Sequence, residues 1–500
     1  MALDLFDLTK KRAKLSPNKI AFEDLQTGKT RTYLEVENRT AQFAALLKGK
    51  GVTPSDRVAV ICRGRTEFFE LLFACAKLGA VLVPLNWRMP ASELAPIISD
   101  CAPRIIVYGR ADETTAKSLA QHNCTHINLD APGFEAALLQ CAEVQYRDVW
   151  PGGDTWYLLY TSGTTGTPKA VIQTYQMALV NAVNIGQAIH INSNDCTLNF
   201  LPLFHTAGIN LHTLPTFMNG GQIKLLDGFD VDRVIKILAS GEIDTFFGVP
   251  AVYQALAEHK GFAHTNLDKV RSFGCGGAPM PDILVQKFAE KGALVCNGMG
   301  MTETGPTLFL MDAEHVTTKI GSVGKPQILS AVRLVGSDGL TVKTGEPGEL
   351  EISGSGITPG YFQNSDETKK AFTNDGWLKS GDIARQDEDG YYYIVGRTKD
   401  MYISGGENIF PIEIENILAA HPSILEVAVI GVPDVKWGEV GHAFIMLRSG
   451  SELDIAKTQA FCKQQLASFK IPKHFTVVAD FPRTAAGKIR KHLLNVSGDT

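Results

Sequence analysis

The sequence predicts an α/β protein with a large N-terminal domain, a small β-rich subdomain and a C-terminal α+β domain. Two observations predict this fold class. In the first 150 residues, short apolar strands alternate with segments of helical apolar spacing, which indicates parallel strands with helices on both faces of a sheet. Between about 330 and 397, strands are separated by Gly and Asp turns, which is typical of a smaller antiparallel sheet or barrel.

The N-terminal region supplies the strands and helices of the parallel sheet. Residues 57–62 are expected to form a short buried strand, and residues 67–78 have the apolar spacing of a helix. Strands are expected again at 80–84 and at 104–108. Because strands and helices alternate here, we expect βαβ units in a sheet that helices cover.

The last third of the chain is expected to hold two smaller units. The N-terminal domain would span 1–398 and include the β-rich subdomain at about 330–397, whereas the C-terminal domain would span 399–500. Strands are expected at 331–335, 348–352, 390–395 and 426–430, and helices at 411–420 and 453–466.

Composition excludes several classes of protein. Of 500 residues, 44% are hydrophobic and 20% are charged, which excludes a disordered, collagen-like or disulfide-scaffold chain. The formal charge of −5 gives no general attraction to nucleic acid or to an anionic membrane. A chain of this length exceeds a single core, so two or three domains are expected.

The sequence also predicts a compartment. The most apolar stretch, 71–85, contains Lys77 and falls short of the roughly 20 apolar residues of a membrane span. Asp4 and Asp7 interrupt what would be the apolar region of a signal peptide. The nine cysteines include no C-x-x-C pair, which favours reduced thiols. We therefore expect a cytoplasmic protein.

The segment most indicative of function is Leu158-Leu-Tyr-Thr-Ser-Gly-Thr-Thr-Gly-Thr-Pro-Lys169. Glycines let backbone amides turn toward an anion, hydroxyl groups add donors and lysine adds charge, so the segment predicts a phosphate-binding loop. A Walker A loop is excluded because the pattern G-x-x-x-x-G-K-[ST] is absent. A flexible surface loop is the alternative interpretation of this composition.

The same segment resembles the phosphate loop of the adenylate-forming superfamily, which includes acyl-CoA synthetases, luciferases and the adenylation domains of peptide synthetases. Ala170 stands where that family usually has glycine. The resemblance extends over essentially the whole chain, and the layout is most similar to bacterial fatty-acid and 4-coumarate or feruloyl–CoA ligases. Five further segments resemble family motifs in the family's order: Gly298-Met-Gly-Met-Thr-Glu-Thr-Gly305, Trp377-Leu-Lys-Ser-Gly-Asp382, Gly396-Arg-Thr-Lys-Asp400, Ser404-Gly-Gly-Glu-Asn-Ile-Phe-Pro411 and Pro482-Arg-Thr-Ala-Ala-Gly-Lys-Ile-Arg-Lys491.

The resemblance implies a site for ATP and Mg²⁺. Thr302 would contact the α-phosphate, Glu303 would help to hold Mg²⁺, and Asp382 and Arg397 would bind the ribose. Met299 replaces the aromatic residue that usually packs on adenine, and its polarizable thioether can lie against a ring. The implied cofactor-binding residues are Thr161, Ser162, Gly163, Thr164, Thr165, Gly166, Lys169, Gly277, Ala278, Pro279, Asn297, Gly298, Met299, Gly300, Met301, Asp382, Ile394, Arg397, Ser404, Gly405, Gly406 and Glu407.

The resemblance also implies a mobile C-terminal domain. Lys488 matches the catalytic lysine of adenylation, and Lys399 matches the hinge. A rotation about this hinge would withdraw Lys488 and bring the Gly405-Gly406 segment to the tunnel for the pantetheine arm of coenzyme A. Each residue has a structural alternative: Glu303 as an acid at a helix N-terminus, Lys488 as a cation in a basic tail, and Gly405-Gly406 as a hairpin turn.

Leu201-Pro-Leu-Phe-His-Thr-Ala-Gly-Ile-Asn210 resembles the acyl-pocket segment, in which His205 gates or flanks the carboxylate. The implied walls include no arginine to pair a second carboxylate, which disfavours dicarboxylates, and no acidic residue, which disfavours amino acids. The sequence leaves open a hydroxycinnamate such as ferulate or coumarate and a medium-to-long-chain fatty acid. The implied acyl pocket consists of His205, Gly208, Ile209, Phe247, Gly248, Val249, Met301, Pro306 and Thr307.

Taken together, the resemblance implies an AMP-forming carboxylic acid–CoA ligase that uses ATP, Mg²⁺ and coenzyme A. One alternative is a stand-alone adenylating enzyme that loads a carrier protein; that the chain ends shortly after Lys488 favours coenzyme A. Another alternative is a non-catalytic nucleotide-binding regulator. The presence of Lys488, Glu303 and Asp382 at the matching motif positions disfavours it. The expected partners are these small molecules, without nucleic acid or an integral membrane segment, and a homodimer is left open.

Overall fold

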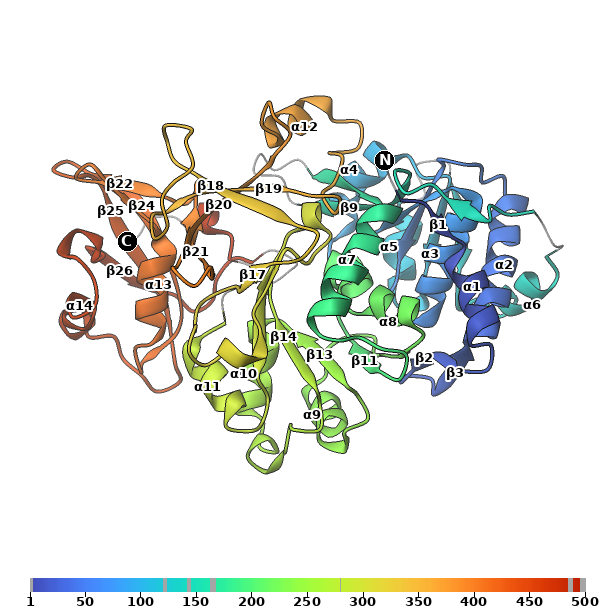
Figure 1. The fold of residues 1–500 in the computed structure, drawn as a ribbon, viewed down its shortest axis with the longest axis horizontal. Coiled ribbons are helices and arrows are strands. Elements are labelled where there is room, and N and C mark those ends of the chain that lie inside the picture. The colour runs from blue at the N-terminus through green and yellow to red at the C-terminus, as the bar shows by residue number, and fades with distance from the viewer. Residues whose placement is uncertain are drawn as a thin grey trace.

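The structure is a computed structural model that describes residues 3–119, 124–141, 145–161, 168–278, 280–483 and 489–494. Figure 1 shows the chain running from an N-terminal unit at the right, through a central sheet, to a C-terminal unit at the left. The α/β fold class is confirmed. No helix in the described part of the chain is both long and apolar enough to cross a membrane.

A six-stranded sheet forms the core of the N-terminal unit, in the order β10-β9-β5-β4-β6-β7. Its strands are parallel except for β10, which pairs with β9 as an antiparallel hairpin. All residues of β5 and β6 are buried, because helices cover both faces. The strands are β4 (Arg57–Ile61), β5 (Val81–Pro84), β6 (Ile105–Tyr108), β7 (Thr125–Asn128), β9 (Thr155–Thr161) and β10 (Lys169–Thr174).

A nine-stranded sheet follows, in the order β17-β16-β15-β14-β13-β11-β12-β2-β3. The six strands from β15 to β2 in this order are parallel, so the carboxyl ends of β11, β13, β14 and β15 lie at one edge, where α/β proteins bind ligands. The strands are β2 (Ile20–Asp24), β3 (Lys29–Thr32), β11 (Cys196–Asn199), β12 (Gln222–Leu225), β13 (Thr245–Gly248), β14 (Ser272–Cys275), β15 (Val295–Met299), β16 (Phe309–Leu310) and β17 (Lys325–Pro326).

Helices cover these sheets, and some of them begin at a polar side chain that caps the first turn. Thr32 and Glu35 form a capping box at the start of α2, and Asp230 caps α9 by accepting a hydrogen bond from the Arg233 amide. The helices are α1 (Leu8–Leu15), α2 (Tyr33–Gly49), α3 (Thr66–Leu78), α4 (Ala91–Cys101), α5 (Glu113–Ser118), α6 (Phe134–Leu139), α7 (Tyr175–Ala188), α8 (Thr213–Asn219), α9 (Val231–Ser240), α10 (Pro250–Glu258), α11 (Asp282–Ala289) and α12 (Ser365–Ala371). A short ribbon pairs β1 (Leu5–Phe6) with β8 (Val149–Trp150).

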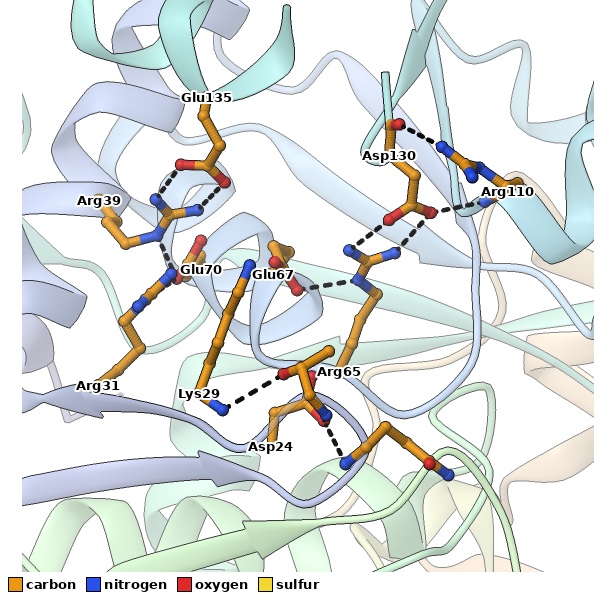
Figure 2. Close-up of polar contacts among 12 residues, drawn as sticks. Asp24, Lys29, Arg31, Arg39, Arg65, Glu67, Glu70, Arg110, Asp130 and Glu135 are labelled. Carbon is orange, nitrogen blue, oxygen red and sulfur yellow. Dashed lines mark hydrogen bonds and ion pairs between the residues drawn. The ribbon is translucent and has the colours of Figure 1, made fainter. Parts of the chain in front are cut away.

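Ion pairs connect helices of the N-terminal unit (Figure 2). Arg39 of α2 contacts Glu135 of α6 with two nitrogens and Glu70 of α3 with a third, at 2.7–3.1 Å. Arg65, at the start of α3, donates to Glu67 and, with two nitrogens, to Asp130 after β7. The planar guanidinium groups therefore join helices that are separate in sequence.

The β-rich subdomain is an antiparallel sheet in the order β18-β19-β20-β21, as expected for residues 330–397. Its strands are β18 (Ala331–Val335), β19 (Gly348–Ser353), β20 (Leu378–Gln386) and β21 (Tyr392–Arg397).

The C-terminal unit combines a sheet with two helices. Its elements are β22 (Tyr402–Ser404), β23 (Glu407–Ile409), α13 (Pro411–Ala419), β24 (Ile424–Asp434), β25 (Gly438–Leu447), α14 (Ile455–Lys463) and β26 (His474–Val477). The helix expected at 453–466 is shorter, because Asp454 caps its start by accepting from the Lys457 amide.

Candidate active site

The hairpin of β9 and β10 presents the predicted phosphate loop. Thr161 and Lys169 are opposite residues of the two strands and close the loop at its base. The Lys169 ammonium is paired with Glu367 of α12 and lies 5.7 Å from the centre of the Tyr361 ring. Ser162, Gly163, Thr164, Thr165 and Gly166 lie outside the described residues.

Glu303 lies at the centre of the predicted site, on a short turn of helix at Thr302–Thr304. Its carboxylate is 8% exposed and accepts a hydrogen bond from the Tyr361 hydroxyl at 2.9 Å. Burial raises the pKa of Glu303, and the charges of Arg397 and Lys169 oppose that rise. The fold therefore brings Glu303 within the electrostatic influence of Lys169 and Arg397, which the sequence places far from it.

The turn that holds Glu303 is fixed by backbone groups of neighbouring elements. Gln173 of β10 donates to the Thr302 carbonyl at 2.8 Å, and the Thr358 amide donates to the Glu303 carbonyl at 2.9 Å. One of these contacts comes from a residue far before the turn in the sequence and the other from a residue after it, and together they orient Thr302 and Glu303. Sequence reasoning missed Gln173, Thr358 and Tyr361, because none belongs to a recognised motif.

Glycines at the carboxyl edge of the nine-stranded sheet stand where a side chain would clash or strain the backbone. A Cβ atom added to Gly300 would lie 1.3 Å from the Pro306 carbonyl oxygen, so no other residue fits there. Gly277 has a φ of +82°, which favours glycine. Ala278, Gly298, Met299 and Met301 lie on the same edge, after or within β14 and β15, whereas Pro279 lies outside the described residues.

Asn297 of β15 offers a free acceptor at this edge. Its amide nitrogen donates to the Ser322 carbonyl at 3.4 Å, but its Oδ1 is buried without a hydrogen-bond partner among the described residues. A buried acceptor of this kind is costly unless a ligand supplies a donor. The amino group of a nucleotide base is such a donor, so the residues present fit ATP.

Asp382 and Arg397 are opposite residues on β20 and β21. The Arg397 Nε donates to the Asp382 Oδ1 at 2.8 Å, and Asp382 is buried. Ile394 lies on the same strand as Arg397. These strands bring the two predicted ribose contacts together, and Lys399 lies in the turn that follows β21.

The predicted acyl segment folds as a π-helix at Ala207–Leu211. π-helices are rare and occur frequently at functional sites. Asn210 donates to the Gly305 carbonyl, and Asn181 of α7 accepts from the Thr307 amide at 3.2 Å. These two asparagines, which sequence reasoning missed, join both halves of the predicted acyl pocket.

The other predicted acyl-pocket residues belong to this helix, to the segment just before it, to the end of β13 and to the segment that follows β15. His205 lies just before the helix, with its ring 4.6 Å from that of Phe204, and Gly208 and Ile209 are buried within it. Phe247 and Gly248 end β13, Val249 follows, and Pro306 lies beside Thr307.

The hairpin Ser404-Gly405-Gly406-Glu407 joins β22 to β23. Both glycines have a positive φ, 61° and 88°, as a two-residue turn between antiparallel strands requires. No hydrogen bond or ion pair connects this hairpin to Glu303 or Asp382 within the described ranges. Lys488 lies outside the described residues, so its position is a prediction from sequence.

No group of three or more His, Cys, Asp or Glu side chains could hold a metal ion within the residues the structure describes. Mg²⁺ would therefore take most of its oxygen ligands from phosphate and water, as it commonly does. The buried carboxylate of Glu303 fits the single protein ligand that this arrangement needs.

Comparisons with known proteins show what the chain as a whole is similar to. A family model described as AMP-binding enzyme matches residues 9–362, and a model described as AMP-binding enzyme C-terminal domain matches residues 413–488. A feruloyl-CoA synthase from an Amycolatopsis species is 37% identical over 96% of each chain. A long-chain-fatty-acid–CoA ligase from Mycobacterium tuberculosis is 34% identical over 97% of each chain. The structure of an o-succinylbenzoate CoA synthetase from Bacillus subtilis in complex with its acyl-adenylate intermediate superposes with a TM-score of 0.90, at 29% identity over 98% of each chain.

Proposed function

Because the chain belongs to the AMP-binding enzyme family and is an AMP-forming acid–CoA ligase, we propose that its acid is a hydrophobic monocarboxylate. The enzyme uses ATP, Mg²⁺ and coenzyme A. In the first half-reaction the acid attacks the α-phosphorus of ATP and releases pyrophosphate. In the second, the thiol of coenzyme A replaces AMP to give acyl-CoA.

One observation supports the residue assignment most: the positive charges of Lys169 and Arg397 act on the buried carboxylate of Glu303. Catalysis of phosphoryl transfer depends mostly on positioning and on stabilising charge. Lys169 and the rest of its loop would bind the β- and γ-phosphates, and Thr302 would contact the α-phosphate. When bound, Mg²⁺ neutralises part of the phosphate charge, and Glu303 would hold the ion. A nearby cation also favours the ionised form of the buried Glu303 carboxyl group.

Lys488 is proposed to bridge the acid's carboxylate and the α-phosphate, where its positive charge offsets repulsion between two anions. Arg397 and Asp382 would hold the ribose, and His205 would flank the carboxylate. For the second half-reaction, the segment from Ser404 to Glu407 would line the path of the pantetheine arm, because glycines let a thin ligand pass close to the backbone.

The pocket walls support a monocarboxylate. Apart from His205, the residues assigned to the pocket are apolar or small, and no arginine is among them. Pyrophosphate release is measured at fixed ATP with ferulate, coumarate, benzoate, octanoate and palmitate, and for comparison with a dicarboxylate and an amino acid. We expect release only with hydrophobic monocarboxylates; a preference for a dicarboxylate or an amino acid would contradict the assignment.

The acceptor is tested separately. Thioester formation with free coenzyme A is compared with transfer to a phosphopantetheinyl carrier protein, and we expect free coenzyme A to react at least as fast.

The division into domains at 1–398 and 399–500 is likewise proposed, because the two family matches leave Lys399 between them. A homodimer is the oligomer we propose to test, by light scattering of the purified chain.

The cytoplasm is the proposed compartment. All nine cysteines are free thiols, and burial raises the pKa of several of them, including Cys62, Cys75 and Cys275. Free thiols are typical of a reducing compartment. The cytoplasm also supplies ATP and coenzyme A.

A further inference from the structure

The segment that follows β19 lies along β10, the second strand of the phosphate hairpin. Tyr361 is paired with Val171 of β10 in an isolated antiparallel bridge, and the Phe362 amide donates to the Ala170 carbonyl at 2.9 Å. Ala170 is the residue next to Lys169, which would bind phosphate. The backbone of Tyr361 is therefore held beside the base of the predicted phosphate loop.

The same segment also contacts the turn that carries Glu303. The Thr358 amide donates to the Glu303 carbonyl at 2.9 Å, and the Thr358 hydroxyl donates to the Ile172 carbonyl of β10 at 2.7 Å. Thr358 is buried, with 2% of the residue exposed. The segment thus joins the strand that leaves the phosphate loop to the turn that carries the predicted ligand of Mg²⁺.

The Tyr361 side chain interacts with charged groups of both elements. Its hydroxyl donates to the Glu303 Oε1 at 2.9 Å, and the Lys169 ammonium lies 5.7 Å from the centre of its ring. An ionised carboxylate only accepts hydrogen bonds, so the hydroxyl must be the donor. A cation within about 6 Å of the centre of an aromatic ring is attracted to the face of the ring. One side chain therefore interacts with the predicted ligand of Mg²⁺ and with a predicted ligand of phosphate.

The hydroxyl restrains Glu303 in a way that the backbone contacts do not. The Thr358 amide fixes the backbone of Glu303, but the side chain has rotatable bonds that a backbone hydrogen bond leaves free. The Tyr361 hydroxyl holds the carboxylate itself, and it engages Oε1 rather than Oε2. Mg²⁺ demands near-ideal octahedral geometry, so a carboxylate that is already oriented suits it. Groups that hydrogen-bond a metal-ligating side chain typically contribute about 10–100-fold to metal affinity.

We propose that Tyr361 is a positioning residue for Mg²⁺–ATP: its hydroxyl holds the Glu303 carboxylate in the orientation that binds Mg²⁺, at a fixed place relative to Lys169. This inference rests on the proposed function, because it takes Glu303 as a ligand of Mg²⁺. The alternative is a structural hydrogen bond, which satisfies a buried carboxylate and leaves metal binding unaffected.

The test measures the dissociation constant of ATP by calorimetry, once with saturating Mg²⁺ and once in EDTA, and takes the ratio as the gain in affinity from Mg²⁺. The enzymes are the unaltered chain, Tyr361→Phe and, as a matched control, Tyr391→Phe. Tyr391, whose hydroxyl donates to the Asp312 carboxylate at 2.7 Å, is not among the predicted site residues.

We expect Tyr361→Phe to reduce the gain by about tenfold, because the carboxylate loses the donor that orients it. The affinity for ATP in EDTA should stay within about twofold, since phenylalanine keeps the ring beside Lys169 and the backbone contacts with β10. The same measurement shows that the variant is folded. Tyr391→Phe should keep the full gain.

A second pair of variants connects the effect to Glu303. Glu303→Ala removes the predicted ligand, and Glu303→Ala combined with Tyr361→Phe removes both partners of the hydrogen bond. We expect Glu303→Ala to lose most of the gain. Adding Tyr361→Phe should change the remainder by less than about twofold, because the hydroxyl then has no carboxylate to hold.

A full gain in Tyr361→Phe would overturn the inference and leave the ligase assignment intact. An equal reduction by Tyr361→Phe with and without the Glu303 carboxylate would also overturn it, because the hydroxyl would then act on ATP binding by another route. A full gain in Glu303→Ala would contradict the proposed metal ligand itself, and the inference would fail with it.

Discussion

At the scale of single residues, Lys169 is bound in this structure to a carboxylate of its own chain. Its ammonium pairs with Glu367, which also contacts Lys370 at 2.9 Å. The hydrogen bond from Lys169 is the largest influence that lowers the pKa of Glu367 to about 2. We propose that phosphate competes with Glu367 for Lys169, so that Lys169 exchanges partners when ATP binds.

This exchange predicts that Glu367→Gln lowers the KM for ATP. Solvent screens an exposed ion pair, so releasing Lys169 should lower the KM by no more than about fivefold. The KM is measured by pyrophosphate release at saturating acid. Glu388→Gln removes an exposed carboxylate on the β20–β21 connection and serves as the control. An unchanged or higher KM in Glu367→Gln would show that Lys169 does not exchange partners.

His212 gives a second prediction at this scale. Its pKa of about 4 in the folded state lies below the ordinary value of 6.5, because burial disfavours the charged ring. The unfolded chain therefore binds a proton that the folded chain does not, so stability is present above pH 6.5 and is lost as pH falls toward 4. The full loss is about 3 kcal/mol.

Melting temperatures from pH 7 to pH 4.5 test this contribution. We expect the melting temperature of the unaltered chain to fall more steeply over this range than that of His212→Leu, because the variant cannot take up the proton. Parallel curves for the two proteins would contradict a buried neutral imidazole.

At the scale of elements, the sequence predicted strands and helices well where apolar patterns are strong. The strands expected at 57–62 and 331–335 appear at Arg57–Ile61 and Ala331–Val335, and the helix at 67–78 appears at Thr66–Leu78. The second strand of the phosphate hairpin, β10, was not expected. β10 forms because it pairs with β9 in the folded chain. From the sequence alone, Lys169 could equally be the last residue of a loop.

The turn after β21 is the element predicted to act as a hinge. The Thr398 amide donates to the Gly381 carbonyl, and the amides of Asp400 and Met401 donate to the Arg397 carbonyl. The Lys399 amide makes no backbone hydrogen bond in the described part of the chain. Proline at this position would therefore fix φ without breaking a backbone hydrogen bond.

We predict that Lys399→Pro leaves acyl-adenylate formation within about twofold and slows thioester formation by at least about 30-fold, equivalent to about 2 kcal/mol of barrier. The physical reason is that a fixed φ hinders rotation of the C-terminal domain between the two half-reactions. Single-turnover measurements of each half-reaction check it, with Lys399→Ala as the control that keeps backbone freedom. Equal losses in both half-reactions would contradict the hinge.

At the scale of the whole molecule, the motifs identified the chemistry but not the contacts that hold the site together. Glu303 and Asp382 were found because they lie in recognisable segments. Tyr361, which donates to Glu303, and Asn210, which donates to the Gly305 carbonyl, lie far in sequence from the groups they contact. Such pairs arise only when separate sheets pack, so no local pattern could predict them.

We propose that Lys488, delivered by the C-terminal domain, drives adenylation but not thioester formation. The most direct test measures ATP–pyrophosphate exchange and, separately, the reaction of preformed acyl-AMP with coenzyme A, in the unaltered chain and in Lys488→Ala. We predict that exchange falls by 10²–10⁴, about 3–5 kcal/mol of barrier, while the second reaction stays within about threefold. Undiminished exchange in Lys488→Ala, or an equal loss in both reactions, would contradict the account.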